Sequence, residues 1–200
     1  ILCRMSNKKS TSRCIHTLAQ TMKSMLTTRN SRVFIQHENN SQFDEFKGSR
    51  IVIISCGKSK NHGPKCQSKD AYNGTSFILK KKYAESSGQS WYILSAKYGL
   101  LSPETPIDPN YDQTIKTKED IQQLASKIAK QLPDFLEFSI SDEAVFLGPQ
   151  AYVTALENAL EGKTNIKINH VTKGLGQGRT QKKIKELINI SIQKSGIICN

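Results

Sequence analysis

The sequence lacks any apolar run approaching the roughly 20 residues that span a bilayer, so we expect no membrane partner. It also lacks a regular cysteine framework, since five cysteines occur in 200 residues without a C-x-x-C pair. An odd number of this kind favours a reducing compartment, so we predict a cytoplasmic protein. Cys56, His62 and Cys66 offer three ligands where a structural zinc site needs four, and we predict no bound metal.

Acidic residues are scarce over most of the chain. Lys and Arg number 29 against 17 Asp and Glu, which gives a net charge of +12 at pH 7. Only residues 101–150 are net acidic, so the positive charge falls on the remaining three quarters. A basic surface attracts polyanions, which favours a nucleic-acid partner over solubilising charge spread evenly around the outside.

Residues 1–49 differ in composition from the rest of the chain. They are rich in Ser, Thr, Asn, Lys and Arg, and they begin with Ile1, with Met5 as an alternative start. Apolar residues between Cys14 and Met25 recur every three or four positions, which predicts a short amphipathic helix. The composition fits both an organellar transit peptide and a basic arm that contacts nucleic acid. We therefore divide the chain into an N-terminal extension, 1–49, partly helical or flexible, and an α/β domain, 50–195.

The domain alternates short apolar strands with amphipathic helices, and its length suits a single core. Such alternation implies right-handed crossovers and a parallel sheet covered on both faces. We therefore predict a three-layer αβα fold with a four-stranded, mainly parallel sheet and, after the second strand, a long loop through Thr114. The strands are expected at 51–55, 91–95, 144–147 and 166–171, and the helices at 76–85, 118–131, 150–160 and 180–192.

Each predicted strand ends in a loop that carries residues suited to anionic, planar ligands. In an open parallel sheet the carboxyl ends of the strands lie on one edge, and ligands bind in the crevice beyond it. Loops that are far apart in the sequence are therefore expected to meet at one pocket.

The first strand runs into Ser55-Cys56-Gly57-Lys58-Ser59, which contains the Gly-Lys-Ser ending of a phosphate-binding P-loop. That loop needs a further glycine where this chain has Val52, so the ATPase interpretation fails. What remains is a turn in which Gly57 permits close backbone approach and Lys58 and Lys60 offer charge. The alternative is an ordinary turn with solvated lysines.

The last strand runs into a glycine-rich turn ahead of a helix. Gly174, Gly176 and Gly178 create a concavity of backbone N–H groups, and Arg179 adds a fork of donors, so phosphate binding is reasonable. The segment misses the dinucleotide-binding pattern because Arg179 stands where the third glycine belongs. The alternative is a tight turn used only for its geometry.

The segment Trp91–Leu101 and the loop after it supply the remaining candidates. Ser95, Lys97, Tyr98 and Gly99 stand at a strand end where a planar base could stack and hydrogen-bond, although Tyr98 fits equally well as a packing residue. The following loop carries two carboxylates: for Asp108, beside Pro109, we favour a turn role, and for Asp112, beside Tyr111, a functional one. We expect structural or surface roles for His62 and His170.

These segments together resemble a family of prokaryotic and phage domains. Its pattern is Ser-Cys-Gly-Lys-x-Lys, Trp-Tyr-Ile-Leu-Ser-Ala-Lys-Tyr-Gly-Leu-Leu, Pro-Tyr-Asp-x-Thr and Gly-Leu-Gly-x-Gly-Arg/Lys. In this chain these are Ser55–Lys60, Trp91–Leu101, Tyr111–Thr114 and Gly174–Arg179, with Asn110 where a proline is usual. Such domains are similar to the YaaA peroxide-stress proteins and, more remotely, to the uracil-DNA glycosylase superfamily, whose relatives include antiviral glycosylases.

The resemblance implies a uracil-DNA-glycosylase-like fold and a monomeric DNA glycosylase that removes a modified base from viral DNA by base flipping, without a cofactor. It implies catalytic roles for Asp112 and Lys97, which would stabilise the sugar cation and the departing base. The base pocket would use Ser55, Cys56, Gly57, Ser95, Tyr98, Gly99 and Tyr111. DNA phosphates would contact Lys58, Lys60, Gly174, Gly176, Gly178 and Arg179. The alternatives are a non-catalytic DNA- or nucleotide-binding module and a nucleobase or nucleotide transferase.

Overall fold

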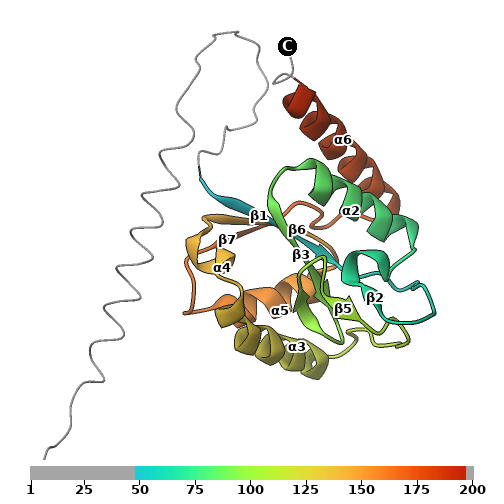
Figure 1. Ribbon diagram of the computed structural model, residues 1–200. Helices are drawn as coiled ribbons and strands as arrows, with labels where there is room; N and C mark the ends of the chain where they lie inside the picture. The colour runs from blue at the N-terminus through green and yellow to red at the C-terminus, as the bar shows by residue number, and fades with distance from the viewer. Residues whose placement is uncertain (1–47, 197–200) are drawn as a thin grey trace, which may run out of the picture. The chain divides into compact units, whose positions relative to one another are not determined.

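The computed structural model describes residues 48–196, so the helix predicted between Cys14 and Met25 lies outside the described part. The four predicted strands are present as β1 (Arg50–Ser55), β3 (Ser90–Ser95), β6 (Glu143–Leu147) and β7 (Lys167–His170). A fifth strand, β4 (Gly99–Leu101), completes a sheet of order β4-β3-β1-β6-β7. Helices cover both faces of this sheet (Figure 1), which confirms a three-layer α/β arrangement.

Strand β1 lies at the centre of the sheet and pairs in parallel with β3 and β6. Its residues Ile51–Ile54 are at most 1% exposed, because one helical layer covers each face of the sheet. A continuous run of β-branched residues is typical of such a strand. Each of these side chains contributes roughly 1.5–3 kcal/mol to stability through burial.

The expectation of a four-stranded sheet with a long loop after the second strand is wrong. The chain reverses at Gly99, whose φ of +78° lies in the left-handed region, and β4 returns antiparallel to β3. The Gln131 side chain accepts a hydrogen bond from the Leu100 N–H and donates to the Leu100 carbonyl, so it satisfies the outer edge of this strand. Further along, β2 (Cys66–Gln67) and β5 (Pro106–Ile107) form a separate two-stranded antiparallel ribbon.

Two helices pack on each face of the sheet. Helices α2 (Thr75–Ser86) and α6 (Gln177–Gly196) cover one face, and α3 (Lys118–Gln131) and α5 (Gln150–Leu160) cover the other. All four were expected from apolar spacing, and α6 begins three residues earlier than predicted. The structure adds the short helix α4 (Glu137–Ile140) and the 3-10 turns η1 (Ser68–Asp70) and η2 (Leu132–Asp134).

The local sequence around Thr117 determines where helix α3 begins. Thr117 and Asp120 form a capping box, in which each side chain accepts a hydrogen bond from the other residue's backbone N–H. This pair satisfies two of the amide groups that a helix leaves open at its start. Leu124 and Ile128 are buried against the sheet, as their spacing predicted.

Gly148 fixes how the end of β6 meets the end of β1. A Cβ at this position would lie 2.7 Å from the Ser55 Cβ and Oγ atoms and 2.8 Å from the Phe146 ring. Only a residue without a side chain fits between these two strands, so the close approach of their carboxyl ends depends on this glycine.

We predict that Gly148→Ala lowers the free energy of unfolding by about 1–3 kcal/mol, because overpacking forces Ser55 or Phe146 to move. Gly63→Ala is the matched control, since a Cβ there meets no atom within 4 Å. Urea unfolding of both variants measures the difference, and equal stabilities would show that the contact with Ser55 carries no strain.

Candidate functional site

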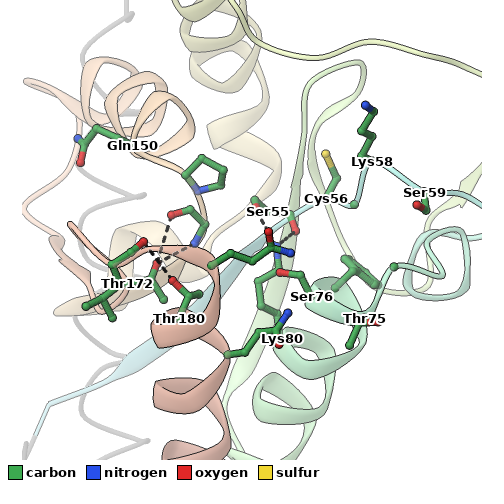
Figure 2. Close-up of a pocket in the computed structure, with 18 of the residues that line it drawn as sticks. Ser55, Cys56, Lys58, Ser59, Thr75, Ser76, Lys80, Gln150, Thr172 and Thr180 are labelled. Carbon is green, nitrogen blue, oxygen red and sulfur yellow. Dashed lines mark hydrogen bonds between the residues drawn. The ribbon is translucent and has the colours of Figure 1, made fainter.

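A cavity of about 890 Å³ lies at the edge of the sheet where β1, β6 and β7 end. Its volume falls within the range of small-molecule sites. Three of the four strand-end loops meet there, each together with the start of a following helix, whereas the loop after β3 does not line it (Figure 2). The walls are Ser55–Ser59 after β1, Gly74–Phe77 and Lys80 of α2, Gly148–Gln150 before α5, and His170, Thr172, Gly174, Leu175, Gln177, Thr180 and Gln181 around the start of α6.

Three helices begin among the residues that line the cavity. Helices α2 and α5 begin after Gly74 and Pro149, and neither residue caps its helix with a side-chain hydrogen bond. The first N–H groups of a helix have no intrahelical partner and carry partial positive charge. The beginnings of α2, α5 and α6 all line the cavity, so it offers donors to an anionic or carbonyl-bearing ligand.

Lys80 provides a buried cation at the cavity. Its Nζ donates to the Ser55 carbonyl at 2.7 Å and to the Ser55 Oγ at 2.6 Å, and the residue is 5% exposed. Burial lowers the pKa of Lys80 to about 8, with a smaller opposing contribution from Cys56. Figure 2 shows Ser55, Ser76 and Lys80 between β1 and α2, with Thr172 and Thr180 across the cavity.

Among the described residues, no Asp or Glu side chain lines the cavity. Lys80 and Lys58 therefore carry positive charge without a carboxylate beside them in the wall. A group that brings negative charge is the complementary ligand, because it would compensate the desolvated lysine and the helix starts.

His170 lines the cavity and is held in place by a hydrogen bond to Gly148. Its Nε2 lies 2.8 Å from the Gly148 carbonyl, so that nitrogen carries the proton, and Nδ1 is buried without a described partner. Thr172 donates to the same carbonyl at 3.2 Å. The Phe146 ring packs edge-on against the His170 ring. We expected only a structural or surface role for His170, but the structure places it at the cavity.

A second group of predicted residues gathers outside the cavity walls, around Tyr111. The Tyr111 hydroxyl lies 2.8 Å from the Tyr72 hydroxyl and 3.0 Å from the Ser95 Oγ. The Nζ atoms of Lys60 and Lys97 lie 4.3 and 4.9 Å from the centre of its ring. Burial raises the pKa of both phenols above the usual range, so they stay protonated and act as hydrogen-bonding groups.

Tyr98 and Cys56 connect this aromatic cluster to its surroundings. The Tyr98 ring packs edge-on against Tyr111, and its hydroxyl donates to the Asp108 carbonyl at 2.9 Å. The Cys56 Sγ lies 3.5 Å from the Tyr152 hydroxyl and also lines the cavity.

The remaining predicted residues divide between these places and the surface. Asp112 is exposed and forms no hydrogen bond or ion pair within the described residues. Gly99 forms the turn that leads into β4. Gly176, Gly178 and Arg179 lie at the start of α6, beside the cavity walls but not in them. Ser55, Cys56, Gly57, Lys58 and Gly174 do line the cavity.

The sequence contains a signal for Lys80 in the spacing of its helix. Lys80 belongs to a run of three lysines, which suggests a solvated face. Phe77, Lys80 and Ala84, however, are spaced as one helix face, and all three are buried. A lysine at such a position has its charge inside the protein. The same reasoning does not reveal Thr75, Gln150 or Thr180, which line the cavity only because their helices begin there.

Comparison with known proteins places the chain in a family. The profile of a family of unknown function, DUF6884, matches residues 51–186, so the protein belongs to that family. The uncharacterised protein YfjM of Bacillus subtilis (strain 168) is 34% identical over 120 residues, which cover 57% of this chain and 78% of that protein. No solved structure matches the chain significantly. The family segment includes every residue that lines the cavity.

Two further observations bear on ligands and membranes. Within residues 48–196, no three His, Cys, Asp or Glu side chains gather in a way that would hold a metal ion. No helix in this part of the chain combines the length and apolar character that crossing a membrane requires.

We predict that burial of Lys80 makes stability pH-dependent. Its pKa is about 8 in the folded chain and 10.5 when unperturbed, so between these values the unfolded chain binds a proton that the folded chain does not. Stability of the wild type relative to Lys80→Met should therefore rise across this range, by on the order of 3 kcal/mol in total. Urea unfolding at several pH values measures this difference, and a constant difference would contradict the burial of the charge.

Proposed function

We propose that this member of DUF6884 is a DNA glycosylase that removes a modified nucleobase from viral DNA. The observation that carries the proposal is the nucleotide-sized cavity, which is lined by helix starts and a buried lysine and contains no carboxylate. Such a cavity suits a nucleotide turned out of the base stack, because the departing base develops negative charge when the N-glycosidic bond breaks.

Support for DNA as the substrate comes from helix α6, whose first turns line the cavity. Lys173 precedes this helix, and Arg179, Lys182 and Lys185 follow along it; we call these four residues the α6 basic tract. All four are exposed, and none forms an ion pair with a described residue. Unpaired cations beside a nucleotide-sized cavity favour a polyanion over a free nucleotide.

The reaction assigned here comes from the resemblance described above, and the geometry supplies roles for it. Amide groups at the starts of α2 and α5 would hold the departing base, since fixed dipoles stabilise a developing negative charge. Lys58 and the α6 basic tract would bind the phosphates around the extruded nucleotide. The resemblance assigns to Asp112 the stabilisation of the sugar cation or the positioning of water, and to Lys97 a donor role toward the base, although neither residue lines the cavity.

A second candidate is a module that binds an extruded nucleotide without cutting it. One observation favours it: Asp112 is exposed outside the cavity walls, and no described residue of those walls is a carboxylate. The fold and the cavity serve both candidates, so only a measurement of base release separates them. The transferase alternative requires an added co-substrate, which the same measurement can include.

We predict that the wild-type chain creates abasic sites in DNA that carries its modification, and that Asp112→Asn binds this DNA but releases no base. Phage DNAs with different base modifications are the substrates, and unmodified DNA is the control. Free base is measured by mass spectrometry, and binding by fluorescence anisotropy. Full release by Asp112→Asn would remove that residue from the mechanism, and no release by the wild type on any substrate would favour the binding module.

We predict that the double variant Lys182→Gln, Lys185→Gln weakens DNA binding through lost phosphate contacts. The slope of log affinity against log salt should fall in magnitude by about 0.9 for each contact removed. Lys118→Gln with Lys130→Gln is the charge-matched control, because both lysines are exposed on α3, which covers the opposite face of the sheet. Equal slopes for the two double variants would refute a role for the α6 basic tract.

A further inference from the structure

The hydrogen bonds of Lys80 can be made by a neutral amine as well as by an ammonium ion. Both described partners of its Nζ belong to Ser55: a carbonyl oxygen at 2.7 Å, which only accepts, and the hydroxyl oxygen at 2.6 Å. A neutral amine has two N–H bonds and one lone pair. The two oxygens use both N–H bonds, which leaves the lone pair unengaged by the described protein. An ammonium ion would carry a third N–H for which no described residue is an acceptor.

The surroundings of Lys80 make its neutral form more accessible than that of a solvated lysine. The residue is 5% exposed, and none of the described residues in the cavity wall is a carboxylate that would hold a positive charge there. The other titratable groups in the wall are Cys56, Lys58 and His170, and none of them is a carboxylate. Burial lowers the pKa of Lys80 to about 8, so roughly one molecule in ten carries the neutral amine at pH 7.

We propose that Lys80 is a nucleophile that forms an imine with an aldehyde in the cavity. A neutral lysine amine attacks carbonyl carbons readily, and a desolvated lysine is a common way to make one. The aldehyde is the ring-opened sugar of an abasic site in DNA. This choice of substrate rests on the proposed function, because an abasic site is the product of base removal.

The proposed reaction needs only water and its protons besides the protein and the DNA. The neutral Lys80 nitrogen attacks C1′ of the open sugar, one proton is taken up from the solvent, and the carbonyl oxygen leaves as water, so that a protonated imine remains. Loss of the C2′ proton to water then breaks the C3′–O bond, and the 3′ phosphate leaves with the electron pair. Water hydrolyses the imine and returns the amine. The Ser55 hydroxyl, at 2.6 Å from Nζ, is placed to pass a proton during loss of water.

The test uses the full chain and a synthetic duplex with a preformed abasic site, so it does not depend on base release. Sodium borohydride reduces an imine to a stable amine, and the trapped protein–DNA adduct is counted on a denaturing gel. We expect an adduct with the wild type and none with Lys80→Met. Lys82→Met is the matched control, because Lys82 is exposed on the same helix, and it should form the adduct as the wild type does.

Peptide mapping and the pH dependence of trapping show which lysine forms the adduct. Peptide mapping of the wild-type adduct should place the modification on Lys80, which settles the assignment even if Lys80→Met does not fold. The trapping rate should rise as pH passes through about 8, where the neutral amine becomes the main form. No adduct with the wild type, or an adduct on another lysine, overturns the proposal. If the chain forms an adduct on Lys80 but releases no base from any substrate, the imine proposal is supported and only the glycosylase proposal is refuted.

Discussion

The burial of β1 on both faces is the constraint on which the rest of this structure depends. Because Ile51–Ile54 are enclosed by the two helical layers, the strand must lie at the centre of the sheet, between β3 and β6. Its end at Ser55 is therefore brought beside Gly148, and Gly148 has no side chain to keep the two strands apart. The cavity opens at this junction, so its position follows from the packing of the core.

The chemical character of the cavity follows from what the fold puts around that junction. Helices that return over a parallel sheet begin at the edge where the strands end, so their open amide groups face the same space. Lys80 reaches the junction from α2 and donates hydrogen bonds to the carbonyl and hydroxyl oxygens of Ser55. The result is a site that is rich in donors and has no carboxylate in its walls, which suits a ligand that bears or develops negative charge.

Much of the fold was predictable because its signals are local. The apolar runs at residues 51–55 and 144–147, and the helical spacing of Leu124 and Ile128, depend on side chains whose burial their own neighbours reveal. Strand β4 was missed because Gly99-Leu-Leu is too short to show alternation, and its outer edge is satisfied by the distant side chain of Gln131. The loop after β3 was expected at the pocket, but β4 and the β2–β5 ribbon hold it in the separate cluster around Tyr111. Lys80 was missed because it sits in a run of lysines, of which only this one faces inward.

The most direct test of the account is to locate the nucleotide on the protein. Titration of ¹⁵N-labelled protein with a short oligonucleotide that contains an unpaired modified base would report on each backbone amide. The account predicts that the largest shifts fall on the cavity amides, those of Gly57, Thr75, Ser76, Gln150 and Gln177. Shifts confined to other surfaces, with these amides unchanged, would contradict it.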